Sequence, residues 1–291
     1  MASLKEVRTR IASVSSTQQI TSAMKMVSAA KFRRAQNAII GMRPYAAQLN
    51  EIIADIATDN GVQTPYHAVR PIQTVALVVV TSNKGLCGAF NSNVIKQAQQ
   101  RIDYWREKGT SVRIVAIGKK ASEQLGKQKD LDLLSHDGLL DSPTFDEVVS
   151  LAESLMTDFA EKRVDRVELI YNQFKNSLSQ ILSCEQWLPV VQNNQSNQNS
   201  QKAQSNDYIY EPSKEEILRE MVPLMLRSTF YRVILDSLAA EHGARMNAMQ
   251  KATDNATELL KDLRLSYNKA RQSAITNEII EIVSGSEALK G

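Results

Sequence analysis

The sequence predicts a mixed α/β fold in which two long terminal helices flank a central strand-and-helix domain. Residues 1–57 and 213–284 carry apolar side chains at three- and four-residue steps, which is typical of helices that pack on another helix. Residues 72–190 alternate short β-branched runs with amphipathic segments, which predicts a mostly parallel sheet covered by helices. We therefore predict an antiparallel coiled coil of the N- and C-terminal helices projecting from a Rossmann-like α/β domain. The predicted segments are 1–60 (N-terminal shaft helix), 70–191 (Rossmann-like α/β domain), 192–211 (Gln/Asn-rich loop and linker) and 212–291 (C-terminal shaft helix).

The first helix has a clear start and a seam of apolar residues. Ser3 and Glu6 form a capping box, in which each side chain satisfies a free backbone N–H of the first turn. Gly41 and Pro44 are its helix-breaking residues. The apolar positions run through Leu4, Val7, Ile11 and Val14, and resume at Ile20, Met24 and Val27.

The central segment predicts five strands and three helices. We expect strands at 75–80, 112–117, 131–134, 167–171 and 178–191, and helices at 89–107, 119–127 and 144–162. A second capping box, Thr144 with Glu147, opens the last of these helices. Residues 192–206 are mostly Gln and Asn with one apolar residue, so we expect a disordered surface loop there.

The last helix is predicted to begin at the capping box of Ser213 with Glu216 and to stop at Gly285. In its heptad frame the a positions repeat every seven residues from Ile217 and the d positions from Met221. Leu259 is one of the a positions and is therefore expected in the seam. At about 1.5 Å per residue the two terminal helices reach ~85 Å and ~108 Å, which exceeds the ~50 Å diameter of a globule of this length. They are therefore expected to pair as a rod, and the longer helix leaves an apolar arc at its end without a partner in the chain.

Charge and composition exclude several classes of protein. Residues 1–43 hold eight basic groups against one acid, although the whole chain has a net charge of only +3. Such a start is typical of a mitochondrial presequence, a nucleic-acid-binding arm or a membrane-surface helix. Cys87 and Cys184 are too few for a disulfide framework, and the three histidines share no metal-ligand spacing. The longest apolar run, 75–80, is far too short to cross a bilayer.

The loop at 85–88 follows a predicted strand, so a phosphate-binding site has to be considered. It contains neither G-x-G-x-x-G nor G-K-[ST], and Lys84 precedes the glycine instead of following it. We therefore interpret the loop as a tight strand-to-helix turn and disfavour a nucleotide-dependent enzyme.

Four motifs resemble one protein family over almost the whole chain. The strongest is the carboxyl-terminal sequence Y-N-K-A-R-Q at 267–272, followed by I-T-N-E-I-I-E-I-V-S-G at 275–285. The others are A-R-M at 244–246 with A-T-D-N at 252–255, I-T at 20–21 with Met24, Val27 and Lys31, and G-L-C-G at 85–88 with Asn91. Ser286 stands where the family usually has Ala, and Asn83 where it often has an acid. The chain thus resembles the γ subunit of F-type ATP synthase, of the bacterial type without the chloroplast cysteine insertion.

The resemblance implies a central-stalk rotor that is not itself catalytic. In this family the paired terminal helices turn inside a ring of three α and three β subunits, and the α/β domain meets the ε subunit and the membrane ring of c subunits. Proton-driven rotation of the c-ring would change the conformation of each catalytic β subunit in turn, for ATP synthesis or, in reverse, hydrolysis. The resemblance implies no bound cofactor or metal, no nucleic acid partner and no transmembrane segment. It replaces the presequence interpretation with a peripheral location on the cytoplasmic side of a bacterial inner membrane.

The same resemblance assigns expected contact residues. Arg271 and Gln272, with Thr276 and Glu278, match a contact with a β subunit, as do Met24 and Lys25 in the first helix. Ile279, Ile282 and Val283 match the tip held in the sleeve of the α/β ring. Tyr210 and Glu211 match the foot segment that meets the c-ring. Without the resemblance, Arg271 and Gln272 are interpreted as part of a solvated helix face, and Met24 as part of the packed seam. Tyr210 and Glu211 are then interpreted only as the segment that leads into the last helix.

Two other functions stay open on the residues alone. A basic antiparallel coiled coil that binds nucleic acid or anionic membrane would bind with steep salt dependence. A nucleotide-dependent enzyme on the α/β domain would bind a nucleotide as an isolated chain.

Overall fold

The computed structural model describes residues 4–57, 64–128, 131–141, 143–176, 179–190, 211 and 213–288. The chain forms two compact units. Unit 1 comprises Met1–Ala29 with Arg245–Gly291, and unit 2 comprises Ala30–Ala244. The long helices α1 (Leu4–Ala57) and α5 (Lys214–Ala288) each contribute to both units. The Gln/Asn-rich segment predicted at 192–206 lies outside the described residues.

Unit 2 contains a five-stranded sheet in the order β3-β2-β1-β4-β5. Three of the four pairings, β1 with β2, β1 with β4 and β2 with β3, are parallel, and only β4 with β5 is antiparallel. The mostly parallel sheet of the prediction is therefore confirmed. The strands are β1 (Thr74–Val80), β2 (Ser111–Ile117), β3 (Asp132–Ser135), β4 (Arg166–Phe174) and β5 (Gln180–Leu188).

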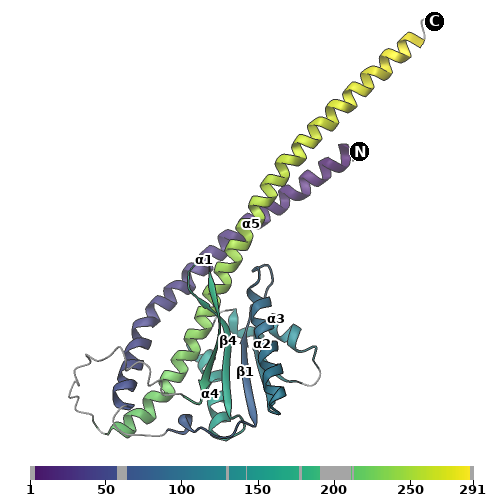
Figure 1. The fold of residues 1–291 in the computed structure, drawn as a ribbon. Helices are drawn as coiled ribbons and strands as arrows, with labels where there is room; N and C mark the ends of the chain where they lie inside the picture. Colours follow the sequence, from purple (N-terminus) through teal and green to yellow (C-terminus); the bar gives the residue numbers. More distant parts are fainter. Residues whose placement is uncertain are drawn as a thin grey trace, which may run out of the picture. The chain divides into compact units, whose positions relative to one another are not determined.

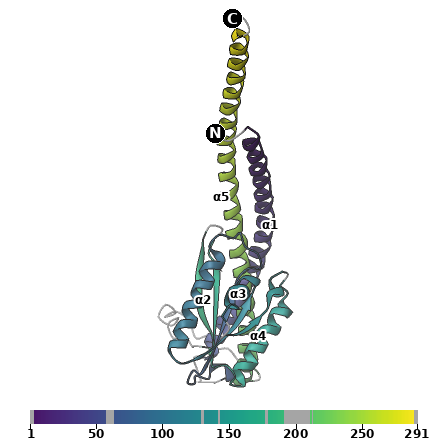
Figure 2. The ribbon, with the colours of Figure 1, turned by 90° about the vertical axis from the view of Figure 1, so that its right-hand side faces the viewer.

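Helices cover both faces of this sheet (Figures 1 and 2). Leu77 and Val79 pack with α2 (Phe90–Glu107) and α3 (Lys119–Leu125), whereas Val78 and Val80 pack with α4 (Phe145–Ala160) and the unit 2 part of α5. Because successive side chains of β1 point to opposite faces, a continuous apolar run was needed to fill both cores. Two short 3-10 helices, η1 (Pro65–His67) and η2 (Asp137–Leu140), were not predicted.

Two of the predicted helix starts are confirmed by hydrogen bonds. The Thr144 hydroxyl accepts from the backbone N–H of Glu147, and the Ser213 hydroxyl accepts from that of Glu216 at 3.2 Å. The predicted stop at Gly285 is wrong, because α5 continues to Ala288. Gly285 is tolerated in the helix because glycine lowers helix stability without blocking the backbone hydrogen bonds.

In unit 1, α1 and α5 pair in opposite directions. Gln18 Nε2 donates to Thr257 Oγ1 at 2.7 Å, and the hydroxyls of Thr21 and Thr253 lie 2.9 Å apart. As residue numbers rise on α1 they fall on α5, so the predicted antiparallel pairing of the terminal helices is confirmed.

The predicted seam of the pair is partly wrong. On α5, Leu260 is 5% exposed and Leu259 is 40% exposed, so the seam passes through Leu260 and not through Leu259. On α1, Ile20 and Val27 are exposed, whereas the hydroxyl-bearing Thr21 and Ser28 are buried. The prediction followed hydrophobicity alone, but the hydrogen bonds of Gln18 and Thr21 place polar residues in the seam.

Candidate functional site

The end of α5 in unit 1 extends beyond the described start of α1. The hydrogen-bonded pairs place Leu4 opposite residues at about 270–271, so no described residue of α1 faces the later residues of α5 (Figures 1 and 2). From Arg271 to Glu287 every residue except Ala274 is exposed. The sequence-based expectation of an unpaired apolar end is thus matched by the structure of unit 1.

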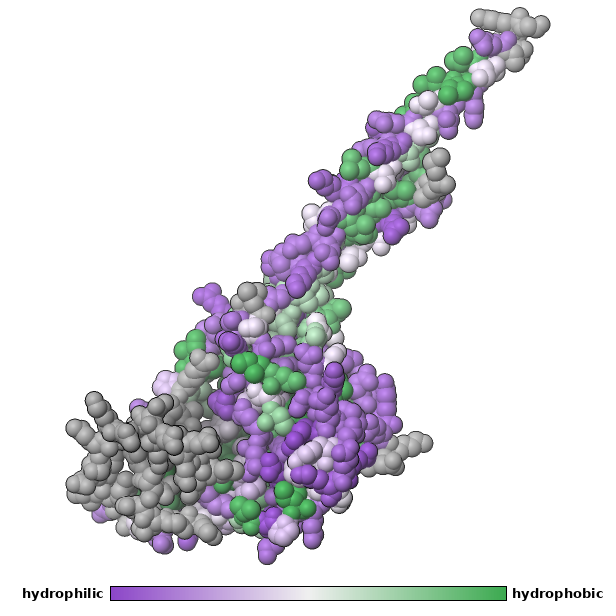
Figure 3. Space-filling model, viewed as in Figure 1, coloured by the Kyte–Doolittle hydropathy of each residue, from purple (hydrophilic) through white to green (hydrophobic). Residues whose placement is uncertain are grey.

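Five β-branched side chains lie along this unpaired end. Figure 3 shows apolar side chains alternating with polar ones there. Their exposed fractions lie between 48% and 70%, which is high for residues of this type. Together they form an apolar surface that no other described residue covers, and such surfaces mark sites of protein interaction. The members are Ile275, Ile279, Ile280, Ile282 and Val283.

The predicted polar contact residues lie on the same helix end. Arg271, Gln272, Thr276 and Glu278 are all exposed. Thr276 donates its hydroxyl to the Gln272 carbonyl at 2.9 Å, so this hydroxyl is already satisfied within the helix. Arg271 makes no ion pair with any residue that the structure describes, which leaves its guanidinium available for an outside carboxylate or carbonyl.

The predicted contact residues of α1 lie apart from these, among the hydroxyl-rich turns of the helix. Met24 and Lys25 are half-buried. Ile20, Met26 and Val27 are exposed, although the sequence interpretation placed Ile20 and Val27 in the seam. The signal that could have corrected it was the seven-residue spacing of Thr21 and Ser28, which places hydroxyls in the seam and leaves Ile20 and Val27 facing outward.

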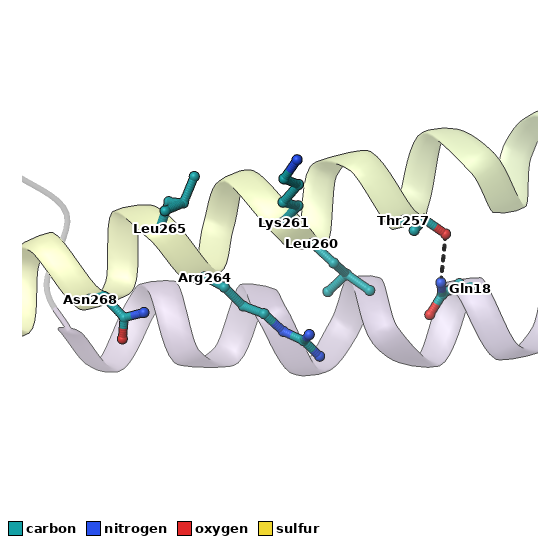
Figure 4. A pocket seen from close by; sticks show the side chains of 7 residues that line it. All are labelled: Gln18, Thr257, Leu260, Lys261, Arg264, Leu265 and Asn268. Atoms are coloured by element: carbon teal, nitrogen blue, oxygen red, sulfur yellow. Dashed lines mark hydrogen bonds between the residues drawn. The ribbon is translucent and has the colours of Figure 1, made fainter.

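A shallow groove of about 420 Å³ runs between α1 and α5 in unit 1 (Figure 4). Its apolar lining comes from Leu260 and Leu265, and its charged lining from Lys261 and Arg264. None of its lining residues is acidic; the others are Gln18, Thr257 and Asn268. The basic residues noted in the sequence, Arg8, Arg10, Lys31, Arg33 and Arg34, are also exposed.

The predicted foot residues are only partly described. Glu211 is exposed, and Tyr210 lies outside the described residues.

The carboxyl edge of the sheet in unit 2, where a Rossmann-like domain would hold a nucleotide, is filled by the chain itself. Cys87 and Phe90 are buried and pack on Ala240 of α5. The Asn91 side chain accepts from the Ser82 backbone N–H at 2.9 Å. A bound phosphate would need this N–H as a donor, and it is already used within the chain. The loop is therefore a closed turn, as the sequence predicted.

Neither a metal centre nor a membrane span is found in the part of the chain that the structure describes. Within those residues, no group of three His, Cys, Asp or Glu side chains could hold a metal ion. No described helix is both long enough and apolar enough to cross a membrane.

Comparisons with known proteins agree with this arrangement. The profile of the family described as ATP synthase matches residues 3–289. The ATP synthase gamma chain of Flavobacterium johnsoniae is 51% identical over 293 residues and that of Christiangramia forsetii 48% over 295, each comparison covering 100% of both chains.

Solved structures give the same result for the fold. A chain of the central stalk and c-ring of the Tetrahymena thermophila mitochondrial ATP synthase is 26% identical with a TM-score of 0.58, covering 80% of this chain and 99% of that one. A rotor chain of the Euglena gracilis mitochondrial ATP synthase is 21% identical with a TM-score of 0.65, covering 94% and 98%. The latter likeness supports the fold alone.

Proposed function

This chain belongs to the ATP synthase gamma chain family, and from that premise we propose a separate role for each of its two units. It is a central-stalk subunit of an ATP synthase and is not itself catalytic. In our proposal unit 1 is the part that turns inside the ring of three α and three β subunits. Unit 2 is the part that joins the ε subunit and the c-ring of the membrane sector, with Tyr210 and Glu211 in the c-ring contact.

The single observation that carries this proposal is the uncovered end of α5. The five exposed β-branched residues of this helix end leave apolar surface in contact with water, which is unfavourable, so the helix end favours burial in another protein. We propose that Ile279, Ile282 and Val283 run in the apolar sleeve of the ring, and that Arg271 and Gln272 bind one β subunit. Thr276, Glu278, Met24 and Lys25 complete the β contacts.

Energy coupling then follows from asymmetry. A two-helix shaft presents different side chains in each direction, so each β subunit meets a different surface at any moment. The shaft changes the conformational equilibrium of a β subunit only by the difference in interaction free energy between its orientations. Proton-driven rotation of the c-ring would present these surfaces to the three β subunits in sequence. Assembly of this kind would hold the chain on the cytoplasmic side of a bacterial inner membrane without a span of its own.

Reconstitution tests this proposal. The chain is mixed with the matching α and β subunits, and native mass and ATPase rate are measured together. We expect one copy of this chain per three α and three β, with turnover that Arg271→Ala changes by about tenfold, since a charge-assisted hydrogen bond contributes about 1.5–3 kcal/mol. Lys269→Ala, which removes another exposed cation from the same helix, is the matched control and should leave turnover near that of the wild type.

The basic surface of unit 1 supplies the alternative. If no ring complex forms and the chain is instead retained on DNA or anionic vesicles at low salt, the rotor proposal fails. The exposed Arg8 and Arg10 would then indicate a nucleic-acid-binding or membrane-binding coiled coil.

A further inference from the structure

Two hydrogen-bonded pairs of polar side chains connect α1 and α5 inside the seam of unit 1. The hydroxyl oxygens of Thr21 and Thr253 lie 2.9 Å apart, and Thr21 is only 8% exposed. About one helical turn away, Gln18 Nε2 donates to Thr257 Oγ1 at 2.7 Å (Figure 4). We call these four residues the polar ladder. The function proposed above gives the ladder no role.

The hydrogen bonds of the ladder fit the hydrogen bonds that each helix makes to its own carbonyls. A threonine hydroxyl has one proton to donate. Thr257 donates its proton to the Thr253 carbonyl at 2.8 Å, so its oxygen is left to accept from Gln18. The Thr253 hydroxyl donates in the same way to the Met249 carbonyl at 2.8 Å, which leaves its oxygen to accept the proton of Thr21. Both pairs can therefore be made at once.

The ladder continues the face of α1 that already packs in the seam. The half-buried apolar residues at the start of α1 recur at three- or four-residue steps as far as Val14. The same steps lead on to Gln18 and Thr21. Ile20 lies one position earlier, about 100° away around the helix, and is 60% exposed.

Hydrophobic burial alone does not explain this choice of face. Ile20 and Val27 on α1 and Leu259 on α5 are between 40% and 60% exposed. Their burial in the seam would remove apolar surface from water, which is favourable. On α1 the structure instead buries Thr21 and Ser28, each of which directly follows one of the exposed apolar residues. The cross-seam hydrogen bonds are what the observed face offers in exchange.

We infer that the polar ladder is a set of positioning residues: its hydrogen bonds fix the rotation of α1 and α5 about their own axes in unit 1 and thereby hold Ile20, Val27 and Leu259 on the outer surface. Polar residues in a coiled-coil seam specify one pairing at a cost in stability. The outer surface is the part of the helix pair that a surrounding protein meets. The ladder thus acts on the coupling of rotation to ATP turnover through the residues that it positions, and this last step rests on the proposed function.

Cysteine labelling of the purified full-length chain tests the inference. The background is Cys184→Ser, because Cys184 is exposed whereas Cys87 is buried. Ile20→Cys reports the outer surface, and Ser28→Cys, at a position that is 3% exposed, reports the seam. Thr21→Ala combined with Thr253→Ala removes both hydroxyls, so neither is left without its partner.

The expected result is a change in opposite directions at the two reporter positions. Without the hydroxyl pair a second rotation of the helices becomes populated, so maleimide labelling should slow about threefold at position 20 and speed up by a similar factor at position 28. A ladder that only stabilised the helix pair would give faster labelling at both positions, since a loosened pair exposes every residue of the seam more often.

Conservative and distant substitutions supply the controls. Thr21→Ser combined with Thr253→Ser keeps both hydroxyls and should restore the labelling rates of the wild-type ladder. Thr17→Ala removes a hydroxyl that donates to Ser13 within α1 and should also leave both rates unchanged. In the reconstituted ring complex, the double alanine variant should lower ATPase turnover severalfold and the double serine variant should keep it.

Three results would overturn the inference. Unchanged labelling at positions 20 and 28 in the double alanine variant would show that other contacts fix the rotation. Faster labelling at both positions would reduce the ladder to a stabilising contact. Altered labelling with normal turnover would remove the step from helix rotation to coupling. Because labelling is measured on the chain alone, failure of the wild-type chain to assemble would contradict only the proposed function.

Discussion

Unit 2 and unit 1 use apolar residues in opposite ways. In unit 2 all six residues from Val75 to Val80 are fully buried between helices on two faces. In unit 1 the apolar residues of the α5 end are about half exposed or more, and polar hydroxyls occupy part of the seam. This difference in burial indicates that unit 2 is stabilised by its own core, whereas much of the apolar surface of unit 1 is available to other proteins.

The largest expected effect comes from truncating a core residue of unit 2. Phe159 is fully buried and lies under the Arg70 guanidinium, whose carbon is 4.4 Å from the ring centroid. Phe159→Ala should lower the free energy of unfolding by about 3–5 kcal/mol, measured by tryptophan fluorescence in urea because Trp105 and Trp187 both belong to unit 2. Ile282→Ala on the exposed end of α5 should change it by less than about 0.5 kcal/mol. Equal effects would contradict the contrast between the units.

Acid should weaken unit 2 through a buried carboxylate. Glu168 is 1% exposed; burial alone would raise its pKa, but Arg101 at 2.6 Å, Trp105 and Arg166 hold the pKa below its usual value. A lowered pKa in the folded state gives stability that is present above the usual value of about 4.5 and is lost as the pH falls below it.

Glu168→Gln tests that statement. Removing the charge leaves two partly buried guanidinium groups without their carboxylate, so we expect a loss of about 2 kcal/mol at pH 7. The variant should also show a shallower fall in stability as the pH drops below the usual carboxyl pKa of about 4.5, followed by tryptophan fluorescence. An unchanged acid profile would mean that other carboxylates, such as Asp165 with its Arg70 partner, control acid unfolding.

The corrected seam of unit 1 predicts unequal effects for two adjacent leucines. Leu260→Ala removes a buried side chain and should cost about 2 kcal/mol, whereas Leu259→Ala should cost less than about 1 kcal/mol because that side chain is 40% exposed. Hydrogen exchange of the backbone amides near residues 253–263 measures the local change. The reverse order would restore the seam expected from the heptad pattern alone.

The smallest expected effect concerns the hydroxyl pair across the two helices. Thr21→Val and Thr253→Val should each cost about 1 kcal/mol by leaving the other hydroxyl without its partner across the seam. The double variant should lose less than the sum of the single changes, and the same hydrogen-exchange measurement gives the coupling energy. Thr17→Val is a control, because Thr17 donates only to Ser13 within α1.

The sequence alone determined the kinds and approximate limits of the elements. β1 was predicted at 75–80 and lies at Thr74–Val80, and α4 was predicted at 144–162 and lies at Phe145–Ala160. These elements were predictable because apolar periodicity and capping residues act over a few neighbouring positions. The unpaired end of α5 was predictable because the limits of both terminal helices follow from local patterns, and their lengths can then be compared without knowing any contact.

Which side chains meet is seen only in the tertiary structure. There Ile20 and Val27 face outward, Thr21 lies opposite Thr253, and the seam passes through Leu260 and not through Leu259. The tertiary structure also gave Leu86 its left-handed backbone, and brought Arg101 and Arg166 to Glu168. These outcomes depend on hydrogen bonds, burial and charge pairs between residues up to 239 positions apart, which no local pattern encodes.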